Sequence, residues 1–183
     1  MINFRAKYIN TQKIIKNDNN QYKQHDVAFV QINSQCENDI LCLKSVEKTW
    51  GKKALVKDLV KDINQEWETK KADKNAKYFA LTSQKNGFEK LLPQKILGVI
   101  ELLTTSDKNT DYINILEVEP NSIYGAKQRR FVNIGSSILN ALKENLNNKD
   151  FILEARENVV KFYEKNGFKS VNNFGLMKFT RLI

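Results

Sequence analysis

The stretch best suited to chemistry is a basic loop that leads into a helix start, IYGAKQRRFVNIGSSILNALKE at residues 123–144. Asn133 is a favourable N-cap residue, because its side-chain oxygen can accept a hydrogen bond from a free backbone N–H group. The turn that follows, IGSS, is slim, and the free amides and dipole of such a turn attract anions. Positive charge beside it comes from Lys127, Arg129 and Arg130. The pattern indicates a phosphate or pyrophosphate site, while an ordinary capped helix with basic neighbours is the simpler interpretation of these residues alone.

Other catalytic and metal motifs are missing from the sequence. The loop has no Gly-Lys-Ser/Thr sequence of a Walker A loop and no Gly-x-Ser-x-Gly frame of a nucleophile elbow. Cys36 and Cys42 match no metal or redox spacing, so we expect small apolar helix residues. The single histidine, His25, leaves no material for a multi-histidine site. We therefore expect no metal cofactor.

The composition is that of an ordinary globular protein. The chain has 183 residues, is 41% hydrophobic and 28% charged, and contains 7 glycines and 2 prolines. These values exclude collagen-like, low-complexity and broadly disordered classes, and the length suits one domain spanning residues 1–183. No apolar run approaches the ~20 residues that a membrane-spanning helix needs, and the N-terminus lacks the apolar segment of a signal peptide. We expect a cytoplasmic protein with reduced thiols and no membrane partner.

The chain carries an excess of positive charge. Lys and Arg number 30 against 21 Asp and Glu, which gives a formal net charge of +9. Such charge attracts nucleic acid, phosphorylated cofactors or acidic proteins. Scattered surface lysines that keep the protein soluble are the simpler interpretation.

Apolar periodicity predicts an α/β (α+β) fold. Alternation from Ile2 to Tyr8 and an apolar run from Asp26 to Asn33 predict two strands, which would form an N-terminal β-hairpin within residues 1–33. Two amphipathic helices, divided by Gly51, follow within residues 37–72. We then expect three antiparallel strands at residues 76–83, 94–105 and 110–119, followed by a helix that begins at residue 134. A strand at 151–155, a helix at 157–165 and two short strands at 168–171 and 175–182 should follow. A strand–helix–strand passage implies parallel pairing, so the sheet should be mixed, mostly antiparallel and twisted, with helices on both faces.

Three motifs resemble a known family. The segment FYEKNGF at residues 162–168 resembles the end of motif B of the GNAT superfamily of N-acetyltransferases. The segment RFVNIG at residues 130–135 looks like motif A of that family, Arg/Gln-x-x-Gly-x-Gly/Ala. Before it, ILEVEP at residues 115–120 looks like the fourth strand of the family. The resemblance covers residues 94–171, and the order of elements fits nearly the whole chain.

The sequence also departs from the family pattern. Asn133 stands where motif A has its first glycine, and the loop between Pro120 and Arg130 is longer than is usual in the family. In motif B, Arg156 replaces an asparagine that often precedes the tyrosine, and Asn158 is close but out of register. These departures point to an alternative, a degenerate GNAT fold that binds an acyl-CoA without turnover.

The resemblance implies acetyl-CoA as co-substrate, bound in a V-shaped gap between central strands, the fourth and fifth of the family. The pyrophosphate would lie on the motif A loop, and the pantetheine arm would pair with strand backbone. The apolar phase shifts from Ile113 and Ile115 to Leu116 and Val118, which fits a β-bulge that opens the gap, although a strand buried on both faces gives the same letters. The expected cofactor-binding residues are Leu116, Val118, Arg129, Arg130, Val132, Asn133, Ile134, Gly135, Ser136, Arg156 and Asn158.

The implied chemistry is attack of a primary amine on a thioester. A base must take a proton from the amine, an N–H group must stabilise the oxyanion, and the leaving thiolate needs a proton. Tyr163 occupies the family's position for the general acid, and by the same analogy the Val118 N–H group stabilises the oxyanion. The base would be one of three strand carboxylates, each of which also fits a plain surface role: Glu117 as first choice, then Glu101 and Glu119.

The leading hypothesis is therefore an acetyl-CoA-dependent N-acetyltransferase that acts on a primary amine. The regions that line the acceptor cleft carry no recognisable motif, and the net charge mildly favours an acidic or nucleic-acid acceptor, such as a charged tRNA. Besides the non-catalytic fold, the alternative is a basic nucleic-acid-binding module that uses Lys127, Arg129 and Arg130 on phosphates. A monomer and a homodimer are both consistent with the sequence.

Overall fold

The computed structural model describes residues 5–18, 21–51, 54–107, 109–123, 126, 129–146 and 149–180. Within them lie nine strands: β1 (Lys7–Asp18), β2 (Gln21–Ile32), β3 (Ala76–Thr82), β4 (Ile96–Thr104), β5 (Thr110–Val118), β6 (Phe131–Val132), β7 (Asp150–Glu154), β8 (Lys169–Ser170) and β9 (Leu176–Phe179). The α-helices are α1 (Glu37–Trp50), α2 (Val56–Thr69), α3 (Ile134–Asn145) and α4 (Val160–Lys165). Short 3-10 helices are η1 (Pro93–Lys95), η2 (Pro120–Ser122) and η3 (Glu157–Val159). Lys127, singled out in the sequence, lies outside the described residues.

The strands form a single mixed sheet in the order β6-β1-β2-β3-β4-β5-β7-β9-β8. Each neighbouring pair is antiparallel except β5 and β7, which run parallel because α3 connects them. The predicted fold class, a mixed and mostly antiparallel sheet with helices on both faces, is confirmed.

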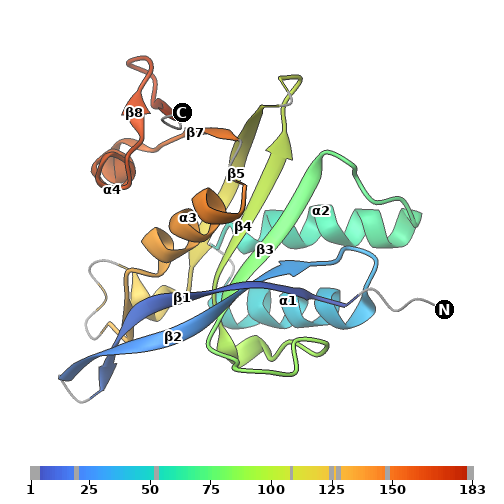
Figure 1. Cartoon of the computed structure of the whole chain (residues 1–183). Helices are drawn as coiled ribbons and strands as arrows, with labels where there is room; N and C mark the ends of the chain where they lie inside the picture. Colours follow the sequence, from blue (N-terminus) through green and yellow to red (C-terminus); the bar gives the residue numbers. More distant parts are fainter. Residues whose placement is uncertain are drawn as a thin grey trace.

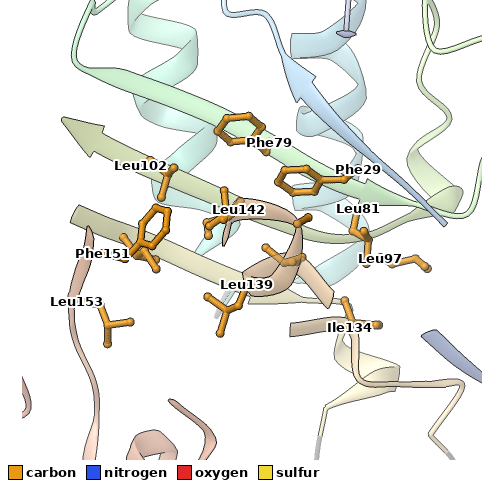
Figure 2. Close-up of a cluster of buried hydrophobic side chains, with 14 of the residues drawn as sticks. Phe29, Phe79, Leu81, Leu97, Leu102, Ile134, Leu139, Leu142, Phe151 and Leu153 are labelled. Carbon is orange, nitrogen blue, oxygen red and sulfur yellow. The ribbon is translucent and has the colours of Figure 1, made fainter. Parts of the chain in front are cut away.

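Helices α1 and α2 lie on one face of this sheet and α3 lies on the other (Figure 1), and each face carries one hydrophobic cluster. One packs α1 and α2 against β2, β3 and β4, and α2 contributes a stripe at helical spacing that includes Leu59, Val60 and Ile63. The other lies under α3, where Ile138, Leu139 and Leu142 meet residues from β2, β3, β4 and β7 (Figure 2). Each helix layer thus buries its own apolar stripe against one face of the sheet, so the sheet fixes where the ends of α2 and α3 lie.

Several predicted boundaries were wrong. The first strand was expected to end at Tyr8, but β1 runs from Lys7 to Asp18 and pairs with β2 along its length. Its polar sequence is extended because long-range contacts hold it: Ile14 is buried under α3, and Ile15 and Lys16 pair with β6. The helix expected at residues 157–165 begins with η3 and is α-helical only from Val160. The last two strands are shorter than expected, since β8 covers Lys169–Ser170 and β9 covers Leu176–Phe179.

None of the helices in the described part of the chain is long and apolar enough to cross a membrane. The same residues contain no group of three or more His, Cys, Asp or Glu side chains placed to hold a metal ion.

One buried carboxylate in α1 makes the stability of the fold sensitive to pH. Asp39 is fully buried, and its Oδ2 atom accepts a hydrogen bond from the Asn33 N–H group at 3.0 Å. Its Oδ1 atom is buried without a hydrogen-bond partner among the described residues. Burial raises the pKa of Asp39 from 3.8 to about 6, because the charged form loses its hydration.

We expect Asp39→Asn to flatten the pH dependence of unfolding. A folded-state pKa above the unfolded value stabilises the fold fully below pH 4, and that stabilisation is lost as the pH rises through about 6. The loss is on the order of 3 kcal/mol, and it should be absent in the variant. Urea unfolding of both proteins at pH 4.5 and pH 7.5 measures it. Equal pH dependence of the two proteins would contradict this role of Asp39.

Candidate functional site

The central feature of the site is an open edge of β5. Strands β5 and β7 pair only at Thr110–Tyr112 with Asp150–Ile152. Beyond Tyr112, β5 continues to Val118 on β4 alone, and no strand of the described residues pairs with its other edge. The sheet therefore opens between β5 and β7, the strands that correspond to the fourth and fifth of the expected family.

The open edge presents backbone donors outward. The Glu119 N–H group donates to the Leu97 carbonyl oxygen at 2.8 Å, so it points toward β4. Backbone groups alternate in direction along a strand, so the N–H groups of Val118 and Leu116 point away from β4, into the gap. These are the two residues expected to meet the pantetheine arm and the oxyanion.

A β-bulge precedes this segment, as the shift in apolar phase indicates. The register shifts where Glu101 pairs with Ile115 and Leu102 pairs with Ile113, which leaves Asn114 as the extra residue. Ile113 belongs to the cluster under α3 and Ile115 to the cluster under α1 and α2. The bulge thus turns the side chains of Leu116 and Val118 toward the α3 face, where both pack at the rim of the cluster.

Next to the open edge, the first turn of α3 has free amides. The first intrahelical bond runs from the Ser137 N–H group to the Asn133 carbonyl oxygen at 2.9 Å. For the N–H groups of Ile134, Gly135 and Ser136 no acceptor is recorded in the described part of the chain. The structure thus brings the slim turn and the open edge together at one end of the sheet.

Asn133 works differently from the prediction. Asn133 is the N-cap residue of α3, as predicted, but its side chain makes no capping hydrogen bond, so the expected side-chain role is wrong. Its backbone instead adopts the left-handed conformation, with φ 68° and ψ 17°. This region favours glycine and tolerates asparagine better than most other residues. Asparagine at the position of the first motif A glycine therefore preserves the turn that a glycine would allow.

The N-terminal hairpin braces this turn from the other side. Val132, expected to contact a pyrophosphate, lies in β6 and pairs with Ile15 of β1. The Asn17 N–H group donates to the Arg130 carbonyl oxygen at 2.9 Å, and the Ser137 hydroxyl donates to the Lys13 carbonyl oxygen at 2.8 Å. Strand β1 thus holds the chain both before and after the free amides.

Arg129, directly before the segment that resembles motif A, and Arg130, its first residue, are together called the motif A arginines; both contact oxygens of the protein itself. Arg129 donates from Nε to the Ser122 carbonyl oxygen at 3.3 Å. Arg130 is half-exposed, lies 3.9 Å from a carboxylate oxygen of Glu119, and stacks over the Phe131 ring. Glu119 is buried and accepts a hydrogen bond from the Ser122 hydroxyl at 2.8 Å. Glu119, considered as a base, is therefore part of the network that closes the long loop after β5.

Helix α4 contacts the first turn of α3 through Phe162. A Cβ atom on Gly135 would lie 2.9 Å from Cζ of Phe162, so only glycine leaves room for this ring. Tyr163 packs edge-on against Phe162 and Phe168, and burial raises its pKa to about 12. It therefore stays protonated at neutral pH. Tyr163, Phe162, Leu116 and Val118 are all partly buried and pack against the α3 cluster.

The chain is similar to known proteins in structure but not in sequence. No protein-family model and no curated protein sequence matches the chain. Among solved structures, GCN5 of Tetrahymena superposes with a TM-score of 0.52 at 16% identity, over 80% of this chain and 91% of that one. The ribosomal-protein-S18-alanine N-acetyltransferase of Escherichia coli gives 0.52 at 14% identity, over 84% and 92%. Aminoglycoside 6′-acetyltransferase type Ii gives 0.51 at 14% identity, over 83% and 96%.

This chain has the GNAT fold. The resemblance drawn from its three motifs is thereby confirmed at the level of architecture. The segments that resemble motifs A and B, far apart in the chain, meet where Phe162 lies against Gly135. This contact could not be predicted, because no local pattern relates the two positions.

The motif B residues before α4 lie on the surface. Arg156 and Asn158 are both exposed. The Arg156 carbonyl oxygen accepts a hydrogen bond from the Val159 N–H group at 2.9 Å and so begins η3. In this GNAT fold, the departure from the motif B pattern coincides with a short α4 that starts only at Val160.

The two strand carboxylates on the α1 and α2 face have different partners. Glu117 accepts a hydrogen bond from the Val56 N–H group at 2.5 Å and so caps the start of α2. Burial raises its pKa, although the Val56 and Leu55 amides oppose the rise. Glu101 is almost fully buried and accepts a hydrogen bond from the Asn114 amide at 2.7 Å. Burial raises its pKa as well, so its carboxylate binds a proton more strongly than an exposed one does.

We expect Asn133→Gly to be tolerated and Asn133→Val to destabilise the fold. Glycine adopts φ 68° without strain, whereas a β-branched residue there should lower the free energy of unfolding by about 1–2 kcal/mol. The matched control is Asn140, exposed in the middle of α3, where glycine should be the worse substitution. Urea unfolding of the four variants shows whether the glycine or the valine variant is more stable at each position. The same order of stability at both positions would contradict a left-handed Asn133.

We expect Glu117→Ala to lower the free energy of unfolding by about 1 kcal/mol, because α2 loses its capping acceptor. Glu117→Gln keeps an acceptor oxygen and should unfold close to the unmodified protein. Thermal unfolding distinguishes the two variants. An unchanged melting temperature for Glu117→Ala would mean that the contact with Val56 contributes nothing to the start of α2.

Proposed function

We propose that this protein is an acetyl-CoA-dependent N-acetyltransferase that moves an acetyl group to a primary amine by direct attack. The observation that carries the proposal is the open edge of β5 beside the free amides of α3. The outward N–H groups of Leu116 and Val118 suit an extended pantetheine arm, and three unpaired amides on a helix start suit a diphosphate. The GNAT fold supports this choice over a nucleic-acid-binding module, and both motif A arginines already contact the protein's own oxygens.

Each residue in the gap would have a chemical task. Acetyl-CoA supplies a thioester that a neutral amine can attack. The Val118 N–H group would donate a hydrogen bond to the thioester oxygen as negative charge develops on it. As the nitrogen–carbon bond forms and the carbon–sulfur bond breaks, Tyr163 would give its phenolic proton to the leaving sulfur. Its raised pKa keeps that proton in place at neutral pH.

The proton released by the amine requires an acceptor on the other face. Glu101 and Glu117 both point to the α1 and α2 side of the sheet, and burial raises the pKa of each carboxyl group. Because Glu117 is held by the start of α2, we place Glu101, next to the exposed Asn114, first for this role. The acceptor itself is defined only as a primary amine, and a charged tRNA fits the basic chain as one candidate.

We expect Tyr163→Phe to lower kcat by about 10²-fold or more while leaving CoA affinity within about twofold. The phenylalanine ring keeps the contacts with Phe162 and Phe168, so the melting temperature should not change. Thiol release from acetyl-CoA over a panel of primary amines measures turnover, and calorimetry with CoA measures binding. Tyr22→Phe, at an exposed position on the hairpin, is the matched control and should behave like the unmodified protein.

The outcomes separate the alternatives. No binding heat with millimolar CoA would overturn the proposal and favour the nucleic-acid module. Binding without thiol release on any amine of the panel would support the non-catalytic fold. Full turnover by Tyr163→Phe would remove Tyr163 from the role of general acid but leave the transferase activity standing.

A further inference from the structure

Two lysines of the N-terminal hairpin lie directly opposite each other. Lys16 of β1 is the cross-strand partner of Lys23 of β2. Like charges in this position repel and destabilise a hairpin. Asp18 offsets this only in part, since its carboxylate lies 3.7 Å from the Lys16 ammonium group and both side chains are substantially exposed. A local arrangement that works against stability is the kind of feature found at binding sites.

This lysine pair lies next to the strand that leads into α3. On its other edge β1 pairs with β6, where Lys16 stands opposite Phe131. Directly opposite residues share a face of the sheet, and Phe131 belongs to the cluster under α3. Lys16 and Lys23 therefore lie on the face that carries α3. The chain passes from Phe131 through Val132 and Asn133 to the first turn of α3, so Lys16 stands level with a residue three positions before the helix start.

Further side chains of β2 and of the segment before β6 lie around the lysine pair and form with it one strip of the α3 face. Along β2 the next residue on the same face is His25, whose ring lies 6.3 Å from that of Phe131. Directly before β6, Arg130 reaches over the Phe131 ring and keeps half of its side chain exposed, with Glu119 as its acidic partner. The strip thus carries Lys16, Lys23 and Arg130 against two carboxylates, Asp18 and Glu119. Its net charge remains positive next to a helix start that already favours anions.

We propose that Lys16 and Lys23 bind the 3′-phosphate of CoA and make the protein prefer CoA over its 3′-dephospho form. This inference rests on the proposed function, which places the diphosphate on the amides of Ile134, Gly135 and Ser136. The adenosine end of CoA carries one further anionic group, a phosphate monoester close to that diphosphate. A dianionic group between two lysines replaces their repulsion with two charge-assisted hydrogen bonds. The hairpin is therefore the part of this chain that selects the phosphorylated cofactor.

The test compares CoA with 3′-dephospho-CoA by calorimetry at low salt. The unmodified protein should bind CoA about tenfold more tightly, as one or two hydrogen bonds to a charged group imply. The double variant Lys16→Ala, Lys23→Ala should lose this preference while its affinity for 3′-dephospho-CoA stays unchanged. Lys13→Ala is the matched control: Lys13 stands on the same strand but on the opposite face, with Asp26 as its cross-strand partner, so the preference should persist.

A second measurement tests whether the double variant is still folded. Removing the lysine pair removes a repulsion, so the melting temperature of the free double variant should not fall at low salt. Equal affinity of the unmodified protein for both ligands would overturn this inference and leave the proposed function intact. A preference that survives in the double variant would overturn it too. Failure of the unmodified protein to bind either ligand would instead overturn the proposed function.

Discussion

The parting of β5 from β7 is the constraint on which the rest of the site depends. The two strands pair over a short stretch, and then each follows another partner: β5 stays with β4, and β7 stays with β9. The end of β7 is fixed by the Ala155 N–H group, which donates to the Gly175 carbonyl oxygen at 2.8 Å. Gly175 has φ 88°, and a side chain there would collide with the Ala155 backbone. This close approach holds β7 on β9 and leaves an edge of β5 free to receive a ligand's backbone-like amides.

A free edge is useful only if an anion-binding turn lies beside it. In this chain the left-handed Asn133 provides that turn, because it lets the chain leave β6 and enter α3 with three amides unpaired. The hydrogen bonds from Asn17 to Arg130 and from Ser137 to Lys13 then fix the turn to β1. The long N-terminal hairpin is therefore part of the site and not an appendage to it, and its lysine pair stands where it can add charge to the turn.

The two faces of the sheet carry different charged groups. The total charge is +9, yet the face that α1 and α2 cover carries two acidic side chains. There Glu101 is almost fully buried and Glu117 is half-buried, and burial raises the pKa of each. On the α3 side, Lys16 and Lys23 face each other next to Phe131, and Arg130 lies over the ring of Phe131, three residues before the helix start. Such a division suits an anionic carrier on one face and a proton-releasing amine on the other. The sheet between them prevents the two groups of charge from neutralising each other.

The sequence by itself determined the order of elements except for the two-residue strand β6, which it did not predict, as well as the three motifs and the turn that ends α4. Asn166 and Gly167 predict that turn through local chemistry, and Gly167 has φ 85° with its N–H group bonded to the Glu164 carbonyl oxygen. Periodicity and turn residues are local signals, so the strands and helices they indicate were found, with errors at the ends. The tertiary structure alone decided the contacts between segments that are distant in sequence. These set the length of β1, the contact of Phe162 with Gly135, and the capping of α2 by Glu117. Those features arise from pairings between distant segments, and no local pattern in a single sequence encodes which distant partner a residue will meet.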